Sequence, residues 1–203
     1  MSKATSQVQP LARPLVPAFV REITLIVSAS LFVALCARLT LPLPFTPVPL
    51  TLQNFGVLLV GMMLGARRGF AALVLYLAEG TLGMPVFNPT GPGGLAQLLG
   101  PTGGYLIAYP LVAAIAGFFA DRGRKWLTPS LAPAFFAELC LGAVLAEALL
   151  FAAGVGWLVL ISRQPLLNVA RLALYPFLFA EVIKIMAAAG LVSRPGVARL
   201  LRS

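Results

Sequence analysis

Two charged side chains stand three positions apart in an apolar stretch near the end of the chain. Glu181 and Lys184 are the charged residues of segment 172–192. Residues three apart on a helix lie on the same side, so this carboxylate and this ammonium group share one polar face. Two interpretations stay open: an ion pair that neutralises itself, or a binding site. Since carboxylates accept hydrogen bonds and ammonium groups donate them, such a site suits a small ligand with urea-like or acidic groups.

Two long loops without charge carry further isolated hydrogen-bonding groups. Residues 41–54 and 85–94 are crowded with proline or glycine, which do not propagate a helix. Ordinary turns are shorter and more polar. Their polar side chains are Thr46, Thr51, Gln53, Asn54, Asn88 and Thr90. We expect these loops to form the floor and the lid of a binding site.

A glycine-rich turn follows the second loop. Segment 100–105, Gly-Pro-Thr-Gly-Gly-Tyr, resembles a phosphate loop but lacks the Lys-Ser/Thr ending that grips phosphate and magnesium, so no ATP site is expected. Gly104 allows backbone to approach backbone or ligand. Tyr105 offers a ring and a hydroxyl to a ligand, or else packs as an interfacial aromatic.

The remaining acidic residues do not form a catalytic arrangement. Glu138 and Glu147 are nine residues apart, which is two and a half helical turns, so they point to opposite faces. Each is expected to contact either a charge on a neighbouring helix or a ligand, with a position at the cytoplasmic interface as a further alternative for Glu138; Glu79 is similarly ambiguous. The chain has no histidine, and its two cysteines, Cys36 and Cys140, fall inside apolar segments. We therefore expect no catalytic residue, no metal site, no disulfide and no cofactor.

The elements that must position these groups are membrane-spanning helices. Hydrophobic residues make up 60% of the chain and charged residues 10%, which leaves too little polar surface for a soluble globule. The fold class predicted is an all-α integral membrane protein, a single bundle of six transmembrane helices in the lipid bilayer. The predicted spans are residues 23–41, 50–64, 70–82, 103–120, 135–160 and 172–192. They make one membrane domain, 23–192, between tails at 1–22 and 193–203.

The basic residues set the predicted orientation. With six spans, eleven lysines and arginines fall on one side, in the two tails and near residues 67 and 122–125, while Arg38, Arg163 and Arg171 fall on the other. Such an excess marks the cytoplasmic side, so both termini are expected there and the two uncharged loops outside. This scatter between apolar spans explains the net charge of +9 better than nucleic-acid binding does.

A spacing of small residues appears in the first predicted span. Ser30 and Ala34 are four positions apart, which permits the close approach of another helix. That helix belongs either to a partner subunit or to the bundle itself.

Three motifs together carry a family resemblance. They are Pro-Leu-Pro-Phe-Thr-Pro-Val-Pro-Leu-Thr-Leu-Gln at 42–53, Gly-Met-Pro-Val-Phe at 83–87 and Leu-Leu-Gly-Pro-Thr-Gly-Gly-Tyr-Leu at 98–106. In this order they resemble the BioY family, the biotin-binding S component of energy-coupling factor (ECF) transporters. The resemblance covers residues 23–192. It implies a six-helix protein of the bacterial plasma membrane that captures biotin with high affinity from outside and delivers it inward with a transmembrane coupling protein and ATP-binding subunits.

The resemblance also implies a set of site residues. The family's acidic residue and lysine match Glu181 and Lys184, although Asp is more usual at the first position. The residues implied to contact biotin are Thr51, Gln53, Phe87, Asn88, Gly104, Tyr105, Glu181 and Lys184, and those implied to contact the partner are Ser30 and Ala34. The alternatives are a solitary or oligomeric biotin transporter and, in a different class, an intramembrane enzyme acting on a lipid, which would want a histidine, a metal cluster or paired carboxylates.

Overall fold

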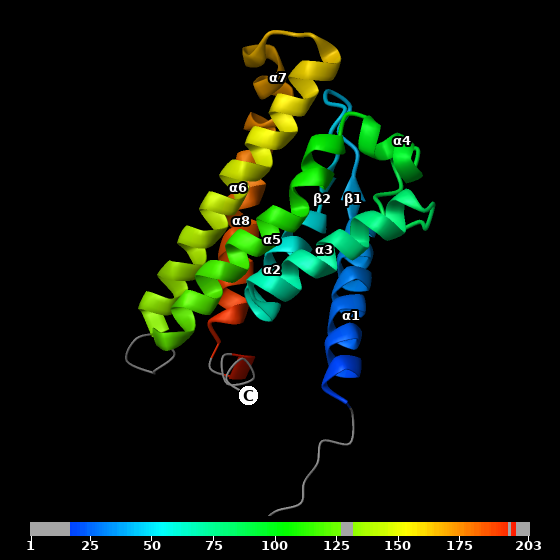
Figure 1. Cartoon of the computed structure of the whole chain (residues 1–203). Coiled ribbons are helices and arrows are strands. Elements are labelled where there is room, and N and C mark those ends of the chain that lie inside the picture. The colour runs from blue at the N-terminus through cyan, green and yellow to red at the C-terminus, as the bar shows by residue number, and fades with distance from the viewer. Residues whose placement is uncertain (1–16, 127–131, 195, 198–203) are drawn as a thin grey trace, which may run out of the picture.

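The chain folds into a helical bundle with one short hairpin (Figure 1). A computed structural model describes residues 17–126, 132–194 and 196–197. The strands β1 (Thr40–Leu41) and β2 (Leu50–Thr51) pair antiparallel, with Thr40 opposite Thr51. The helices are α1 (Ala18–Arg38), α2 (Gln53–Leu64), α3 (Ala66–Thr81), α4 (Gly94–Leu99), α5 (Gly103–Gly123), η1 (Arg124–Trp126), α6 (Ala132–Ser162), α7 (Leu166–Ala173), η3 (Tyr175–Phe177) and α8 (Leu178–Val192).

Length and hydropathy identify some of these helices as membrane spans. In the described part of the chain, α1, α5 and α6 are long and apolar enough to cross a bilayer. The pair α7 and α8 makes a fourth span if the bent pair is counted as one. Helix α2 is apolar but has 12 residues, and α3 has 16. The predicted all-α membrane class is confirmed, while the count of six spans stays a prediction.

The last predicted span, 172–192, is not one straight helix. Helices α7 and α8 meet at an angle of 52°. Pro176 lies within η3 between them, where its ring and missing N–H prevent an α-helix from continuing through. The bend leaves Ala173, Phe177 and Glu181 along one cavity wall.

Helix α5 lies at the centre of the bundle, packed against α6 on one side and against α2 and α3 on the other (Figure 1). Small residues permit these close contacts. Gly61 of α2 lies against the carbonyl of Ala113 in α5, and Gly117 of α5 lies against the backbone of Ala66 in α3. A side chain at either glycine would collide with main-chain atoms, which cannot rotate away.

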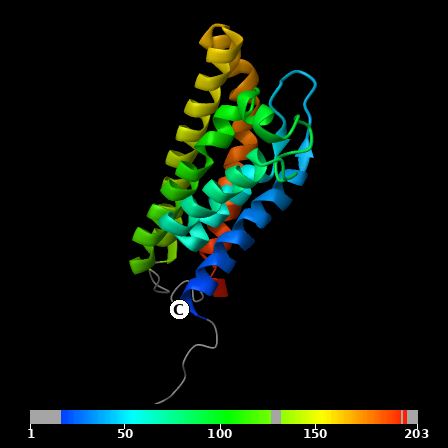
Figure 2. The same ribbon diagram turned by 45° about the vertical axis from the view of Figure 1, so that its right-hand side comes forward.

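The two ends of the bundle differ in character. The starts of α1 and α6 and the ends of α5 and α8 lie together, and the β hairpin, α4 and α7 lie at the opposite end (Figures 1 and 2). Ion pairs concentrate at the first end: Arg68 donates twice to Glu22, at 2.6 and 2.5 Å, and Arg124 pairs with Asp121 at 3.2 Å. The two uncharged loops predicted to lie outside thus share the end opposite the arginine clusters.

Candidate ligand-binding site

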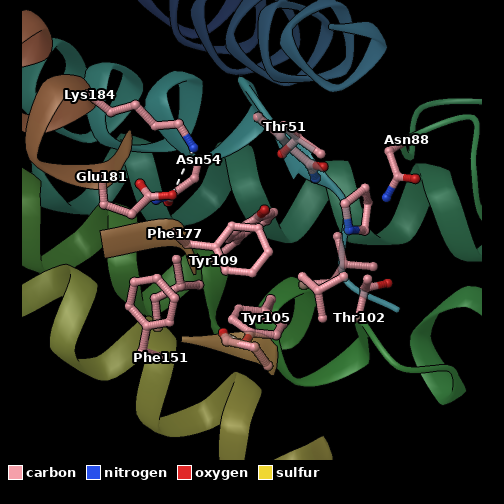
Figure 3. A pocket seen from close by; sticks show the side chains of 16 residues that line it. Thr51, Asn54, Asn88, Thr102, Tyr105, Tyr109, Phe151, Phe177, Glu181 and Lys184 are labelled. Atoms are coloured by element: carbon pink, nitrogen blue, oxygen red, sulfur yellow. Dashed lines mark hydrogen bonds and ion pairs between the residues drawn. The ribbon is translucent and has the colours of Figure 1, made fainter. Parts of the chain in front are cut away.

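A small cavity lies beneath the hairpin, between α2, α5, α6 and α8 (Figure 3). Its volume is about 50 Å³, enough for a few water molecules. Its walls come from segments far apart in the chain: Val48, Pro49, Thr51, Gln53, Asn54, Asn88, Thr102, Tyr105, Leu106, Tyr109, Leu150, Phe151, Ala173, Phe177, Glu181 and Lys184. The hairpin and the second uncharged loop both contribute, as the sequence predicts for a site enclosed by these loops.

The charged pair of α8 lies on the cavity wall. The Lys184 ammonium donates to Glu181 Oε1 at 2.8 Å, and both residues are more than 90% buried (Figure 3). The two groups share one face of the helix, as their spacing predicts. They are paired with each other and also line the cavity, so a ligand there would meet both an acceptor and a donor.

The side chain of Asn54 extends this pair into a network. Its Nδ2 donates to Glu181 Oε2 at 2.8 Å and to Glu147 Oε1 at 2.5 Å. The other amide atom, Oδ1, is buried with no partner among the described residues. One ammonium group and two carboxyl groups are thus gathered at one place inside the bundle, together with an acceptor that nothing satisfies.

Two of these residues were not predicted as ligand contacts. Asn54 was placed in the first loop only as one polar group among several, and it is in fact the second residue of α2. For Glu147 the sequence leaves two interpretations open, contact with a charge on a neighbouring helix or contact with a ligand. In the structure its carboxyl group accepts a hydrogen bond from Asn54. A lone charge in the middle of an apolar helix is the signal that singles out Glu147. Glu138, the other acid of α6, pairs instead with Arg122 at 2.9 Å.

Gln53 joins the first loop to the second. Its Nε2 donates to the Tyr76 hydroxyl at 2.8 Å, and that hydroxyl donates to the carbonyl of Val86 at 2.9 Å. Gln53 is fully buried and lines the cavity. The amide nitrogen of Gln53 therefore holds the second loop in place through Tyr76. Contact of Gln53 with a ligand stays a prediction.

Asn88 and Thr51, both predicted as ligand contacts, also line the cavity. Asn88 Oδ1 accepts hydrogen bonds from the backbone N–H and the hydroxyl of Thr90, at 3.2 and 2.7 Å. The amide nitrogen of Asn88 faces the cavity, with Thr51 of β2 across from it (Figure 3). Buried Gln97 of α4 braces this loop, since its Oε1 accepts the Gly93 N–H at 3.1 Å.

Aromatic rings form the apolar wall. Tyr105, predicted for the site, packs edge-on against Phe151 with centroids 6.1 Å apart, and its hydroxyl donates to the carbonyl of Ala173 at 2.6 Å. Tyr109 and Phe177 lie beside it (Figure 3). The Tyr105 hydroxyl thus ties α5 to the end of α7, while the ring faces the cavity.

Phe87 and Gly104 do not line the cavity, and their contact with a ligand stays a prediction. The Phe87 ring lies over Gly80 and packs edge-on against Tyr76 at 5.4 Å. Gly104 faces α6, where a Cβ atom would come within 2.3 Å of Trp157 Cβ. Both residues shape the walls from behind: Phe87 anchors the second loop, and Gly104 permits α5 to approach α6.

The small residues of α1 have different environments. Ser30 is fully buried, and its hydroxyl donates to Glu79 of α3 at 2.5 Å. Ser30 therefore contacts another helix of the bundle itself, which is one of the two alternatives that the sequence leaves open. Ala34 is half-buried and packs against the core. A partner contact at Ala34 stays a prediction.

The chemistry available at the cavity is that of binding. Among the described residues, no three His, Cys, Asp or Glu side chains are placed to hold a metal ion. The polar wall offers the Lys184 ammonium as a donor and Glu181 and Asn54 Oδ1 as acceptors, and the opposite wall offers aromatic rings. This arrangement fits a compact ligand that has both N–H and C=O groups on one side and apolar atoms on the other.

Comparisons with known proteins place this chain among relatives. The family model described as BioY family matches residues 3–202. The Biotin transporter BioY2 of Lactococcus lactis subsp. cremoris is 33% identical over 163 residues, which cover 80% of this chain and 83% of that protein. The Biotin transporter BioY of Rhizobium etli is 32% identical over 165 residues, 79% of this chain and 84% of that protein.

Two further matches vary in coverage. The Probable biotin transporter BioY of Pyrococcus horikoshii is 44% identical over 110 residues, which cover 53% of this chain and 64% of that protein. The crystal structure at 2.1 Å of the S-component for biotin from an ECF-type ABC transporter matches with a TM-score of 0.75 and 28% identity, over 91% of this chain and 93% of that one. Because the family model spans nearly the whole sequence, the chain belongs to the BioY family.

Proposed function

We propose that this protein is the biotin-binding component of a biotin transporter, which captures biotin from the external face of the bacterial plasma membrane. One observation carries the proposal: the Lys184–Glu181 pair lies buried against a cavity beneath two uncharged loops, in a member of the BioY family. Charges inside a membrane protein are costly and usually functional. A ligand that bonds to both groups offsets that cost.

The ureido ring of biotin matches the polar wall. Its carbonyl accepts a hydrogen bond from the Lys184 ammonium, and its two N–H groups donate to Glu181 and to the unpartnered Asn54 Oδ1. The Asn88 amide nitrogen, on the far side of the cavity, donates to the carboxylate end of the ligand. The thiophane ring and the valeryl chain lie against the aromatic wall of Tyr105, Phe151 and Phe177.

The bundle is placed across the membrane as six spans, with both termini in the cytoplasm. Helices α2 and α3 are about 18 and 24 Å long at 1.5 Å per residue, shorter than the roughly 30 Å hydrocarbon core. We place the hairpin and the loop after α3 partly below the outer surface, where protein surrounds them. The membrane domain is then 23–192, between cytoplasmic tails at 1–22 and 193–203.

Transport inward is assigned to a complex with an ECF transmembrane coupling protein and ATP-binding subunits. The chain shows no phosphate-binding motif of its own. The solved S-component of 28% identity, which belongs to an ECF-type ABC transporter, supports this assignment. Transport by a solitary or oligomeric form is the alternative within the same class. The relatives are named as transporters, so the intramembrane enzyme is not favoured.

Calorimetric titration of the purified, detergent-solubilised protein with biotin tests the proposal. Replacing Lys184 with Met removes the donor and leaves Glu181 without its ion-pair partner. We expect the affinity to fall by at least about thirtyfold, as for the loss of one partner of a buried charged pair. The matched control is Arg67→Met, which removes an exposed cation at the other end of the bundle and should leave the affinity unchanged.

A wild-type protein that binds no biotin contradicts the proposed function. Equal affinity of the wild type and Lys184→Met removes Lys184 from the site but leaves the ligand in place. Uptake of labelled biotin by cells with and without the ATP-binding subunits then separates the ECF complex from the solitary transporter.

A further inference from the structure

The amide of Asn54 lies between two carboxyl groups of different helices. Its Nδ2 is 2.5 Å from Glu147 Oε1 of α6 and 2.8 Å from Glu181 Oε2 of α8. A primary amide has two N–H groups, so each carboxyl group takes one of them. All the donor capacity of Asn54 is therefore used inside the protein.

This arrangement fixes how the Asn54 amide is oriented. An ionised carboxylate only accepts hydrogen bonds, so the nitrogen of Asn54 must point toward Glu147 and Glu181. The oxygen is then directed away from both, and it is buried without a partner at a residue that lines the cavity. Glu147 Oε1 can still accept when Oε2 carries a proton, so this orientation does not require Glu147 to be ionised.

Glu147 does not line this cavity, although with Glu181 it lines a larger apolar groove between α6, α7 and α8. It is 95% buried in α6, which carries no other charge beyond Glu138, and Glu138 is paired with Arg122. A carboxyl group at that depth is costly, and packing alone would favour an apolar side chain. The described structure gives it one hydrogen bond, the one from Asn54.

We propose that Glu147 is a positioning residue for the ligand, acting through Asn54: it holds the Asn54 amide so that Oδ1 stands ready to accept an N–H group of the ligand. The inference rests on the proposed function, because the ureido N–H of biotin is the donor it assigns. With Glu147 replaced by an apolar residue, Glu181 alone restrains the amide. The Asn54 amide can then rotate and turn its N–H groups toward the N–H group of the ligand. Two donors cannot form a hydrogen bond with each other, so binding weakens.

A double-mutant cycle on biotin affinity tests this route. Glu147→Leu should weaken binding by about tenfold, the usual effect of one hydrogen bond to a charged or well-oriented group. Glu147→Gln keeps an acceptor oxygen of the same length and should stay within about threefold of the wild type. In an Asn54→Ala background, Glu147→Leu should cause no further loss beyond about twofold, because the residue through which it acts is gone.

The matched control is Glu138→Leu, which removes the other carboxylate of the same helix and should leave affinity unchanged. If Glu147→Leu does not purify as a monodisperse protein, Glu147→Met replaces it in the same cycle, since Met also lacks a strong acceptor and adapts its shape to the site. A merely structural role would weaken binding equally in both backgrounds.

Each outcome of these measurements either supports or overturns the inference. A Glu147→Leu affinity equal to that of the wild type overturns the inference. So does a tenfold loss that persists with Asn54→Ala, or a Gln variant as weak as the Leu variant. A wild-type protein that binds no biotin overturns the proposed function and this inference together, whereas normal wild-type binding with an unaffected Leu variant overturns the inference alone.

Discussion

The Tyr105 hydroxyl joins two helices at a place where the backbone has few other partners. It donates to the carbonyl of Ala173, the last residue of α7, at 2.6 Å. Carbonyl groups at the end of a helix lack intrahelical partners, so Tyr105→Phe leaves a buried acceptor unsatisfied while keeping the ring. We expect a loss of about 1 to 3 kcal/mol in the free energy of unfolding, measured as a lower melting temperature in detergent.

The control for this change is Tyr175→Phe, at a half-exposed ring in η3. It removes the same atom where solvent or headgroups replace the lost bond, and should not change the melting temperature. Equal melting of Tyr105→Phe and the wild type would show that the contact with Ala173 does not stabilise α7.

At this scale the sequence indicated which residues lie at the cavity where a polar group stood alone among apolar residues, and their contact with a ligand stays a prediction. Glu181 and Lys184 were identifiable because a charge inside an apolar membrane helix is costly. The cavity is also lined by Thr51, Gln53, Asn88 and Tyr105. The link from Asn54 to Glu147 joins residues 93 positions apart, and no local spacing encodes such a pairing. Phe87 and Gly104 came from motifs that specify packing against Gly80 and Trp157 rather than contact with the cavity.

At the scale of elements, the approach of α5 to α6 depends on a missing side chain. A Cβ atom at Gly104 would come within 2.5 Å of the carbonyl oxygen of Ala153 and 2.3 Å of Trp157 Cβ. Main-chain atoms cannot rotate away, so Gly104→Ala must push the helices apart. We expect overpacking to cost about 1 to 3 kcal/mol and to lower biotin affinity, since α5 and α6 both line the cavity.

Gly156→Ala is the matched control, because the added Cβ atom at this position of α6 has no neighbour within 4 Å. A better helix former there should leave the melting temperature unchanged or raise it. If Gly104→Ala melts and binds as the wild type does, the two helices have room that the structure does not show.

The sequence predicted the existence of the helices better than their ends. Apolar runs located α1, α5 and α6 because each is continuous and bounded by charge, proline or glycine. The last span was predicted as unbroken although Pro176 lies inside it, since hydropathy alone does not distinguish a kinked span from two helices. The hairpin at 40–51 was predicted as a loop, because its two-residue strands are too short for a periodic pattern.

At the scale of the whole molecule, the proposed orientation is open to direct measurement. Single cysteines are introduced after Cys36 and Cys140 are replaced by alanine, and intact cells are treated with a membrane-impermeant maleimide. Pro92→Cys and Gln164→Cys lie at exposed positions of the hairpin end and should react from outside. Arg67→Cys lies at the opposite, basic end and should react only after the cells are permeabilised.

Labelling of the permeabilised cells at all three positions is the control for accessibility. Reaction of Arg67→Cys in intact cells would invert the proposed orientation. Reaction of Pro92→Cys and Gln164→Cys on different sides would contradict the count of six spans.

The volume of the cavity has a kinetic consequence. About 50 Å³ admits a few waters but not a bicyclic vitamin, so the walls must move apart before anything larger enters. We expect Val48, Pro49 and Thr51 of the hairpin to move, and this motion rather than diffusion to limit the rate of exchange. We expect a captured ligand to have a long residence time. Substitutions that shorten this residence time should lie in the loop between β1 and β2, away from every charged group.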